Sequence, residues 1–172
     1  MIRNILLHPD PRLRKKAELV TSITPDLKAL AADMLQTMYD APGVGLAAPQ
    51  LGISQRLFVM DCEKGDGAMP RPMVLINPVI TWASDTLNVY DEGCLSLPDQ
   101  YGDVERPAEV RVRWLALDGK EVEADFAGLW ATCAQHEIDH LDGKLFIDYL
   151  KPLRRQMITR RMEKLKRERA RA

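Results

Sequence analysis

The sequence is poor in cysteine and histidine and has no long apolar run. Its three cysteines, Cys62, Cys94 and Cys133, are odd in number and far apart, which argues against a disulfide framework. No stretch approaches the ~20 apolar residues that a membrane span needs. Residues 1–9 are too short, and too clearly interrupted by proline, for a signal peptide. These absences predict a cytoplasmic protein in which each cysteine is a buried apolar residue, a ligand or a nucleophile.

Charge is distributed unevenly along the chain, although the net charge is only −1. Residues 151–172 carry ten Lys and Arg against two acidic residues, a net charge of +8. Residues 1–150 carry 14 basic and 23 acidic residues, a net charge of −9. An acidic body with a basic tail indicates that the tail contacts a polyanion. The alternative is a solvated helix whose charges only keep the protein in solution.

The apolar periodicity changes twice along the chain, from helical to β-type and back. Residues 24–43 begin with Thr-Pro and end with Pro-Gly, which is typical of a helix and its two ends. Short β-type runs lie within residues 56–126, with a hairpin signal at the Asp-Gly pair 118–119. Residues 127–141 and 152–172 are helical again. This order predicts an α+β protein, and the length suits one domain over residues 1–172.

The strongest local signal is the segment His136-Glu137-Ile138-Asp139-His140. On a helix, residues four apart lie on one face, so the two imidazoles can reach a single metal ion. Glu137 lies beside the first histidine, where its carboxylate can reach water on the ion without ligating the ion. Because two of only three histidines stand at this spacing, a metal site is favoured over two surface histidines.

A catalytic metal site needs a third protein ligand and one open position. No histidine follows His140, and no downstream acid stands in a recognisable metalloprotease motif. Cys133 precedes His136 by three residues and so lies on the same helical face, but its apolar neighbourhood is typical of a core cysteine. Cys94 lies in a segment bounded by glycine and proline, which indicates a tight backbone. Spacing favours Cys94 only modestly, so both cysteines remain candidates.

Three separated segments of the sequence resemble the three motifs of the peptide deformylase family. They are Gly43-Val44-Gly45-Leu46-Ala47-Ala48-Pro49-Gln50, Glu92-Gly93-Cys94-Leu95-Ser96 and His136-Glu137-Ile138-Asp139-His140. Their order and separations also fit, and the resemblance spans nearly the whole chain. It implies small mixed or antiparallel sheets packed around a central metal-binding helix, with a C-terminal helix. It also implies a hydrolase that removes the formyl group from the N-terminal formylmethionine of nascent polypeptides and releases formate.

The resemblance implies a role for each matching position. The implied metal ligands are Cys94, His136 and His140, with Fe(II) expected in the cell and Zn, Ni or Co as alternatives. Glu137 becomes the general base and acid, while Gln50 and the backbone N–H of Leu95 become donors to the developing oxyanion. The implied substrate-binding residues are Gly43, Val44, Gly45, Glu92, Gly93, Leu129, Thr132 and Cys133.

Two other functions stay open, and the basic tail has a further reading. A zinc endopeptidase would share the His-Glu-x-x-His chemistry, although the missing downstream motif counts against it. A non-enzymatic module with a structural ion would need four protein ligands, so Cys133 joining the other three would be its mark. The resemblance implies that residues 151–172 are a docking arm for ribosomal RNA, and no membrane or DNA partner is expected.

Overall fold

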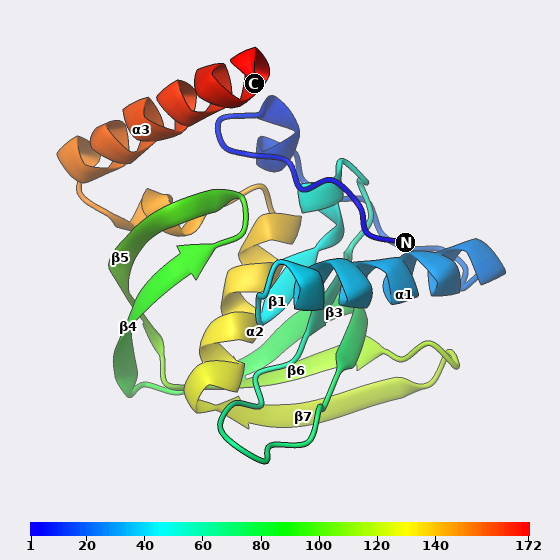
Figure 1. Cartoon of the computed structure of the whole chain (residues 1–172). Helices are drawn as coiled ribbons and strands as arrows, with labels where there is room; N and C mark the ends of the chain where they lie inside the picture. The colour runs from blue at the N-terminus through cyan, green and yellow to red at the C-terminus, as the bar shows by residue number, and fades with distance from the viewer.

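The computed structural model describes all residues, 1–172, as three α-helices and seven strands (Figure 1). The helices are α1 (Pro25–Asp40), α2 (Gly128–Leu141) and α3 (Pro152–Arg171). The strands are β1 (Gly45–Ala47), β2 (Leu57–Met60), β3 (Met73–Ala83), β4 (Leu87–Cys94), β5 (Leu97–Pro107), β6 (Glu109–Leu115) and β7 (Glu121–Ala127). Short 3₁₀ helices are η1 (Pro11–Arg14), η2 (Ala48–Leu51) and η3 (Phe146–Tyr149).

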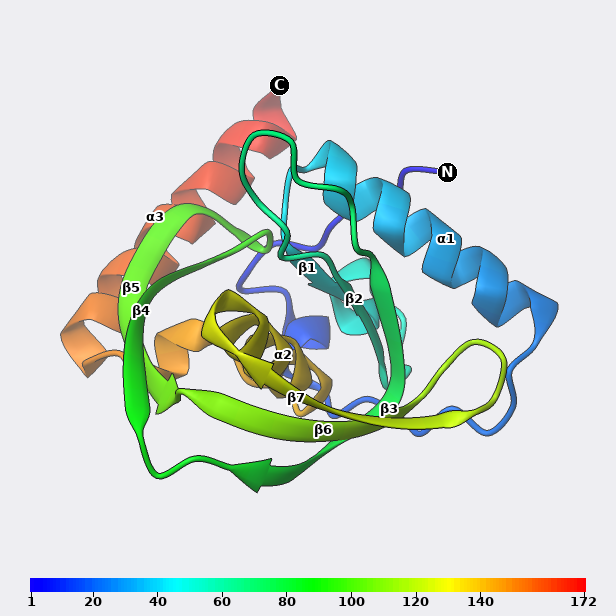
Figure 2. The same cartoon turned by 90° about the horizontal axis from the view of Figure 1, so that it is seen from below.

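The strands form two antiparallel sheets, and α2 lies between them (Figure 2). The larger sheet has the strand order β1-β2-β3-β6-β7, whereas β4 pairs only with β5. In Figure 2 the β4–β5 ribbon lies on one side of α2, and the larger sheet curves around the helix from β6 and β7 to β1 and β2. Helix α1 packs on β1 and β2. The predicted α+β class, with antiparallel sheets around a central helix, is confirmed.

Strand β2 shows how the sequence produces this layering. All four of its residues are buried. Phe58 and Met60 belong to the apolar cluster around α2, while Leu57 and Val59 belong to the cluster under α1. Because successive side chains on a strand point to opposite faces, a strand covered on both faces needs an unbroken apolar run. That is why residues 57–60 are an unbroken apolar run and not an alternation of apolar and polar residues.

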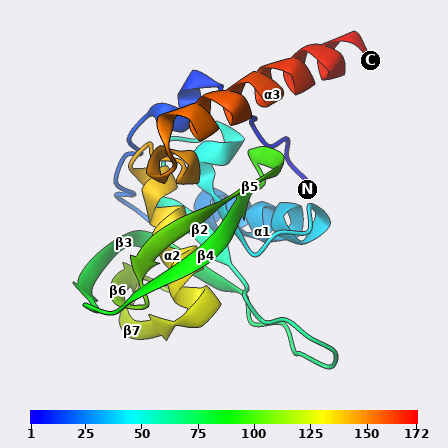
Figure 3. The same cartoon turned by 90° about the vertical axis from the view of Figure 1, so that its left-hand side faces the viewer.

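Several predicted elements are confirmed, and one hairpin was missed. The Thr24 hydroxyl accepts the N–H of Leu27 and so caps α1 as its sequence predicts. The Asp-Gly turn joins β6 to β7. The hairpin of β4 and β5 gave no signal because few of its residues are buried and polar residues interrupt both strands, so no apolar period marks it. Figure 3 shows this hairpin as a long twisted ribbon beside α2.

Helix α3 is fixed to the body by a thin apolar stripe. Ile158 and Met162 are fully buried and pack in a cluster with Leu13, Leu97 and Phe146. The rest of the helix, including most of its basic residues, is exposed. Figure 1 shows α3 along the edge of the molecule. None of the helices combines the length and the apolar character that crossing a membrane requires.

Candidate metal centre and active-site cleft

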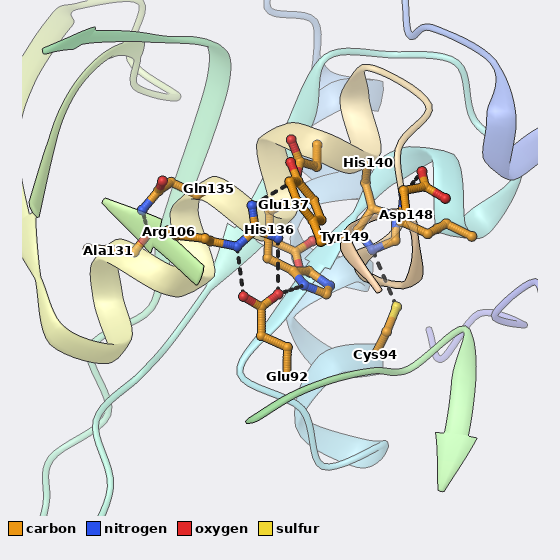
Figure 4. Close-up of polar contacts among 12 residues, drawn as sticks. Glu92, Cys94, Arg106, Ala131, Gln135, His136, Glu137, His140, Asp148 and Tyr149 are labelled. Carbon is orange, nitrogen blue, oxygen red and sulfur yellow. Dashed lines mark hydrogen bonds and ion pairs between the residues drawn. The ribbon is translucent and has the colours of Figure 1, made fainter. Parts of the chain in front are cut away.

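The fold brings one cysteine and two histidines together at the centre of the molecule. His136 and His140 lie one turn apart on α2, and Cys94 is the last residue of β4 (Figure 4). One ligand atom from each lies within 4.8 Å of the others. The Cys94 Sγ atom is 3.3 Å from His140 Nε2. All three meet although Cys94 lies 42 positions before His136 in sequence.

These three residues fit a first-row divalent ion. Bonds of ~2.0–2.3 Å to nitrogen and sulfur place the ligand atoms of a tetrahedral site roughly 3.3–3.6 Å apart, which agrees with the Cys94–His140 separation. Burial lowers the pKa of His140 well below its usual value, so its imidazole stays in the neutral form that metals bind. Three protein ligands leave one position open, as in catalytic sites.

The structure also decides between the two candidate cysteines. Cys94 belongs to the metal-ligating group, and Cys133 does not. The Cys133 thiol instead points to the carbonyl oxygen of Val44, with the sulfur 3.7 Å from that oxygen. The neighbouring Cys62, together with burial, raises the pKa of the Cys133 thiol, which keeps it a neutral apolar group. A four-ligand structural site is therefore absent.

Behind the ligands, a buried ion pair holds the first histidine. Glu92 Oε1 is 2.9 Å from Nδ1 of His136, and both oxygens of Glu92 accept hydrogen bonds from Arg106. Burial by itself would raise the pKa of Glu92, but the hydrogen bonds from His136 and Arg106 outweigh it and lower that pKa. The ionised carboxylate therefore keeps the proton on Nδ1 and turns Nε2 of His136 toward the site.

Asp139 and Tyr149 extend this pair, and the sequence analysis assigned neither of them a role. Asp139 Oδ2 accepts hydrogen bonds from Arg106 at 2.8 Å and from the Tyr149 hydroxyl at 2.7 Å. The Arg106 guanidinium also lies over the Tyr149 ring, 4.7 Å from its centroid. Asp139 sits inside the histidine motif, three residues after His136, and this spacing was its only signal. Nothing local in the sequence marks Arg106 or Tyr149.

Glu137 is a buried carboxyl group whose environment favours the neutral form. Burial raises the pKa of Glu137 to about 7. Its Oε1 is 3.8 Å from His136 Nε2, and its Oε2 has no hydrogen-bond partner. A Cβ atom on Gly45 would lie 2.9 Å from Oε1, so only glycine lets β1 approach this closely. The arrangement can accept and release a proton beside the ligand group.

Gln50 also lies beside the centre and is almost fully buried. Its Oε1 accepts the N–H of Ala47 at 2.9 Å. Its Nε2 is 3.0 Å from the Ser96 hydroxyl oxygen and 3.5 Å from Cys94 Sγ. The side chain therefore presents an N–H group toward the ligand Cys94.

An open cleft of ≈ 780 Å³ borders this centre. His140 does not line the cleft. Every other residue that the sequence analysis assigned to the site does line it. These lining residues are Gly43, Val44, Gly45, Gln50, Glu92, Gly93, Cys94, Leu95, Leu129, Thr132, Cys133, His136 and Glu137. The side-chain oxygens of Glu92 are engaged behind His136, so it borders the cleft without offering them to a ligand.

A buried Cys-His-His group with an adjacent carboxyl, an amide donor and an open cleft defines a metal-dependent hydrolase. A family model described as polypeptide deformylase matches residues 2–156. The peptide deformylase of Rhodopseudomonas palustris (strain BisB5) is 52% identical over 164 residues, 95% of this chain and 94% of the relative. The chain belongs to the polypeptide deformylase family, whose members hydrolyse N-formyl peptides.

Solved structures agree. A crystal structure of a peptide deformylase from Legionella pneumophila superposes with a TM-score of 0.91 at 46% identity, covering 100% of this chain and 99% of that one. The peptide deformylase from Ehrlichia chaffeensis in complex with actinonin gives 0.91 at 34% identity, covering 96% and 98%. The resemblance drawn from three motifs is therefore confirmed, and the endopeptidase and structural-ion readings are not favoured.

Proposed function

We propose that this enzyme removes the formyl group from the N-terminal formylmethionine of newly made chains, with Glu137 as the proton-transferring group. The observation that carries this assignment is the buried carboxyl group beside Cys94, His136 and His140. Its pKa, raised to about 7 by burial, suits a group that must both take and give a proton near neutral pH. Because nascent chains are the substrate, we place the enzyme in the cytoplasm.

One divalent ion is the cofactor, held by Cys94, His136 and His140. When bound, such an ion supplies Lewis acidity that activates water and polarises the formyl carbonyl. We propose Fe(II) as the ion in the cell, with Zn, Ni or Co as substitutes. The thiolate of Cys94 supports this choice because it suits the softer first-row metals. Glu92 fixes the tautomer of His136 from behind the site.

Glu137 performs the two proton transfers. Its carboxylate takes a proton from the attacking water, and the resulting carboxylic acid gives that proton to the leaving amine nitrogen. The carbon–nitrogen bond of the formamide then breaks, and formate and a free N-terminus are released. The state of Oε2 supports this role, because that oxygen is buried beside the ligand group and no protein hydrogen bond holds it.

Gln50 Nε2 and the backbone N–H of Leu95 stabilise the charge that develops on the formyl oxygen. Losing one such donor typically costs ~3 kcal/mol of transition-state stabilisation. The methionine side chain occupies the apolar part of the cleft, against Val44, Leu129, Thr132 and Cys133. Gly43, Gly45 and Gly93 line the cleft along the proposed path of the substrate backbone. A Cβ atom on any of them would collide with a neighbouring side chain, so a larger residue would shift the cleft wall. We reassign Glu92 from substrate contact to positioning.

Formate release from a formyl-Met peptide tests this function. Protein purified without oxygen should release formate, and Glu137→Gln should lose almost all activity while retaining its metal. Glu123→Gln is the matched control, since Glu123 is exposed on β7. Actinonin, which is bound in the Ehrlichia chaffeensis structure, should inhibit the reaction. Cleavage of an unformylated peptide at internal bonds, without formate release, would instead support the endopeptidase reading.

We propose that residues 1–172 form one catalytic domain and that α3 docks it on the ribosome. The +8 charge of residues 151–172 supports this, since such binding depends on phosphate neutralisation and weakens with salt. Truncation is a poor test because it would expose the apolar cluster that Ile158 and Met162 complete. Replacing exposed Arg161, Arg167 and Arg171 by Gln should instead reduce low-salt ribosome pelleting.

The control for the docking test keeps the same change in charge. Arg71, Arg111 and Arg113 are exposed on the body, and replacing them by Gln should leave pelleting unchanged. Equal pelleting of the two triple variants would contradict the docking role of α3. The deformylation assay is independent of this test, so the catalytic assignment does not depend on its outcome.

A further inference from the structure

Ser96 is a fully buried hydroxyl group directly behind the proposed oxyanion donor. Its exposed fraction is 0%. Its Oγ lies 3.0 Å from Nε2 of Gln50. Burying a hydroxyl without a partner is costly, so this contact has a strong physical basis. It connects the β4–β5 turn to the 3₁₀ helix that carries Gln50.

The contacts of the Gln50 carboxamide are three: the N–H of Ala47, the Ser96 hydroxyl and the Cys94 sulfur.

Each of these contacts fixes a different part of the carboxamide orientation. The N–H of Ala47 can only donate, so it fixes which end of the carboxamide is oxygen. The Ser96 hydroxyl accepts one of the two N–H groups on Nε2. The second N–H is then left on the side of the ligand group, where Nε2 is 3.5 Å from Cys94 Sγ.

Ser96 is itself held in place by the backbone. Its carbonyl oxygen accepts the N–H of His8 at 2.9 Å. Residues 95–96 form the tight turn between β4 and β5. Three consecutive residues of this turn region therefore bear on the centre: the ligand Cys94, the proposed donor Leu95, and Ser96 behind Gln50. A shift of the turn would move all three together.

We propose that Ser96 is a positioning residue that holds the Gln50 N–H donor in line with the formyl oxygen. The inference rests on the proposed oxyanion role of Gln50. Without the Ser96 hydroxyl, the carboxamide keeps the N–H of Ala47 at Oε1, but its Nε2 end keeps only the longer 3.5 Å contact with Cys94 Sγ and can rotate away about the terminal bond. A donor that rotates away stabilises the transition state less, whereas ground-state substrate binding changes little.

A double-mutant cycle tests the proposal on metal-loaded enzyme. Ser96→Ala should lower kcat on the order of 10-fold with KM within about twofold, since small misplacements of catalytic groups have effects of this size or larger. Gln50→Ala should lower kcat on the order of 100-fold. In the Gln50→Ala background, Ser96→Ala should have no further effect. Ser84→Ala is the control. It removes a hydroxyl group that makes two hydrogen bonds, and kcat should stay unchanged.

The outcomes separate the proposal from the function on which it rests. Multiplicative effects of the two substitutions, or an unchanged kcat in Ser96→Ala, would overturn the positioning role. Full activity in Gln50→Ala would overturn the oxyanion role and the positioning role together, while Glu137→Gln would still report on deformylation itself.

A spectroscopic measurement covers the case in which Ser96→Ala loses activity through general instability. In zinc-loaded, ¹⁵N-labelled protein, the side-chain amide protons of Gln50 should be protected from exchange with solvent. Ser96→Ala should lose this protection while Gln135, whose Nε2 donates to Pro107 and Ala131, keeps it. Equal loss at both glutamines would indicate a structural defect and contradict the proposal.

Discussion

Glu92 lies 2.9 Å from Nδ1 of His136 and joins this histidine to Arg106 in a buried pair. The relationship matters because a ligand histidine needs its second nitrogen held by an acceptor before its first nitrogen is correctly aimed. The carboxylate is ionised, since the hydrogen bonds from His136 and Arg106 lower the pKa of Glu92 despite its burial.

Glu92→Gln should therefore weaken metal binding by about 10- to 100-fold, the range typical of lost outer partners of metal ligands. Chelator competition at fixed pH measures this change. Asp125→Asn is the matched control, because Asp125 makes a similar two-oxygen pair with Arg111 on the exposed surface. Metal affinity that falls equally in both variants would contradict the assignment.

Tyr149→Phe tests the contribution of the Tyr149 hydroxyl group separately from that of its ring. It removes the 2.7 Å hydrogen bond to Asp139 but keeps the aromatic face under Arg106. We expect a loss of about 1 kcal/mol in the free energy of unfolding and a metal affinity that falls less than in Glu92→Gln. Tyr39→Phe removes a comparable hydrogen bond to Asp61, far from the ligands. Stability should change in both variants, and metal affinity only in Tyr149→Phe.

Gly45→Ala should abolish most of the activity without unfolding the protein. Its Cβ would lie 2.8 Å from Cys133 Sγ and 2.9 Å from Glu137 Oε1. The carboxyl group must then move, and displacement of a catalytic group by even 1 Å costs about 100-fold in rate. Formate release, melting temperature and metal content should be measured together. Near-normal activity would show that the carboxyl group does not need this position.

The sequence predicted the parts of the site that follow a local pattern. The four-residue spacing of His136 and His140 was enough to indicate a metal site. It could not choose between Cys94 and Cys133, because that choice depends on how β4 ends against α2. Arg106 and Tyr149 were missed for the same reason: their contacts with Asp139 depend on tertiary packing, and no spacing marks them. Elements with a strong apolar period were predicted well, whereas the polar β4–β5 hairpin was not.

The stability of the protein should depend on pH through His8, whose Nε2 contacts the Thr159 hydroxyl on α3 at 2.9 Å. Burial, with Arg14 and Lys166 adding to it and Asp148 opposing it, lowers the pKa of His8 from 6.5 to about 4. Between these values the unfolded chain binds a proton that the folded chain does not, so His8 destabilises the fold as pH falls from 6.5 toward 4.

His8→Gln removes this titration while retaining a neutral side chain with an N–H group. The difference in the free energy of unfolding between the native protein and the variant should be constant above pH 7 and shift in favour of the variant as pH falls through the window. Denaturant titrations at several pH values measure it, and metal-ligand titration cancels because both proteins contain the same ligands. A difference that stays flat from pH 7 to pH 4 would show that His8 titrates alike in the folded and unfolded chains.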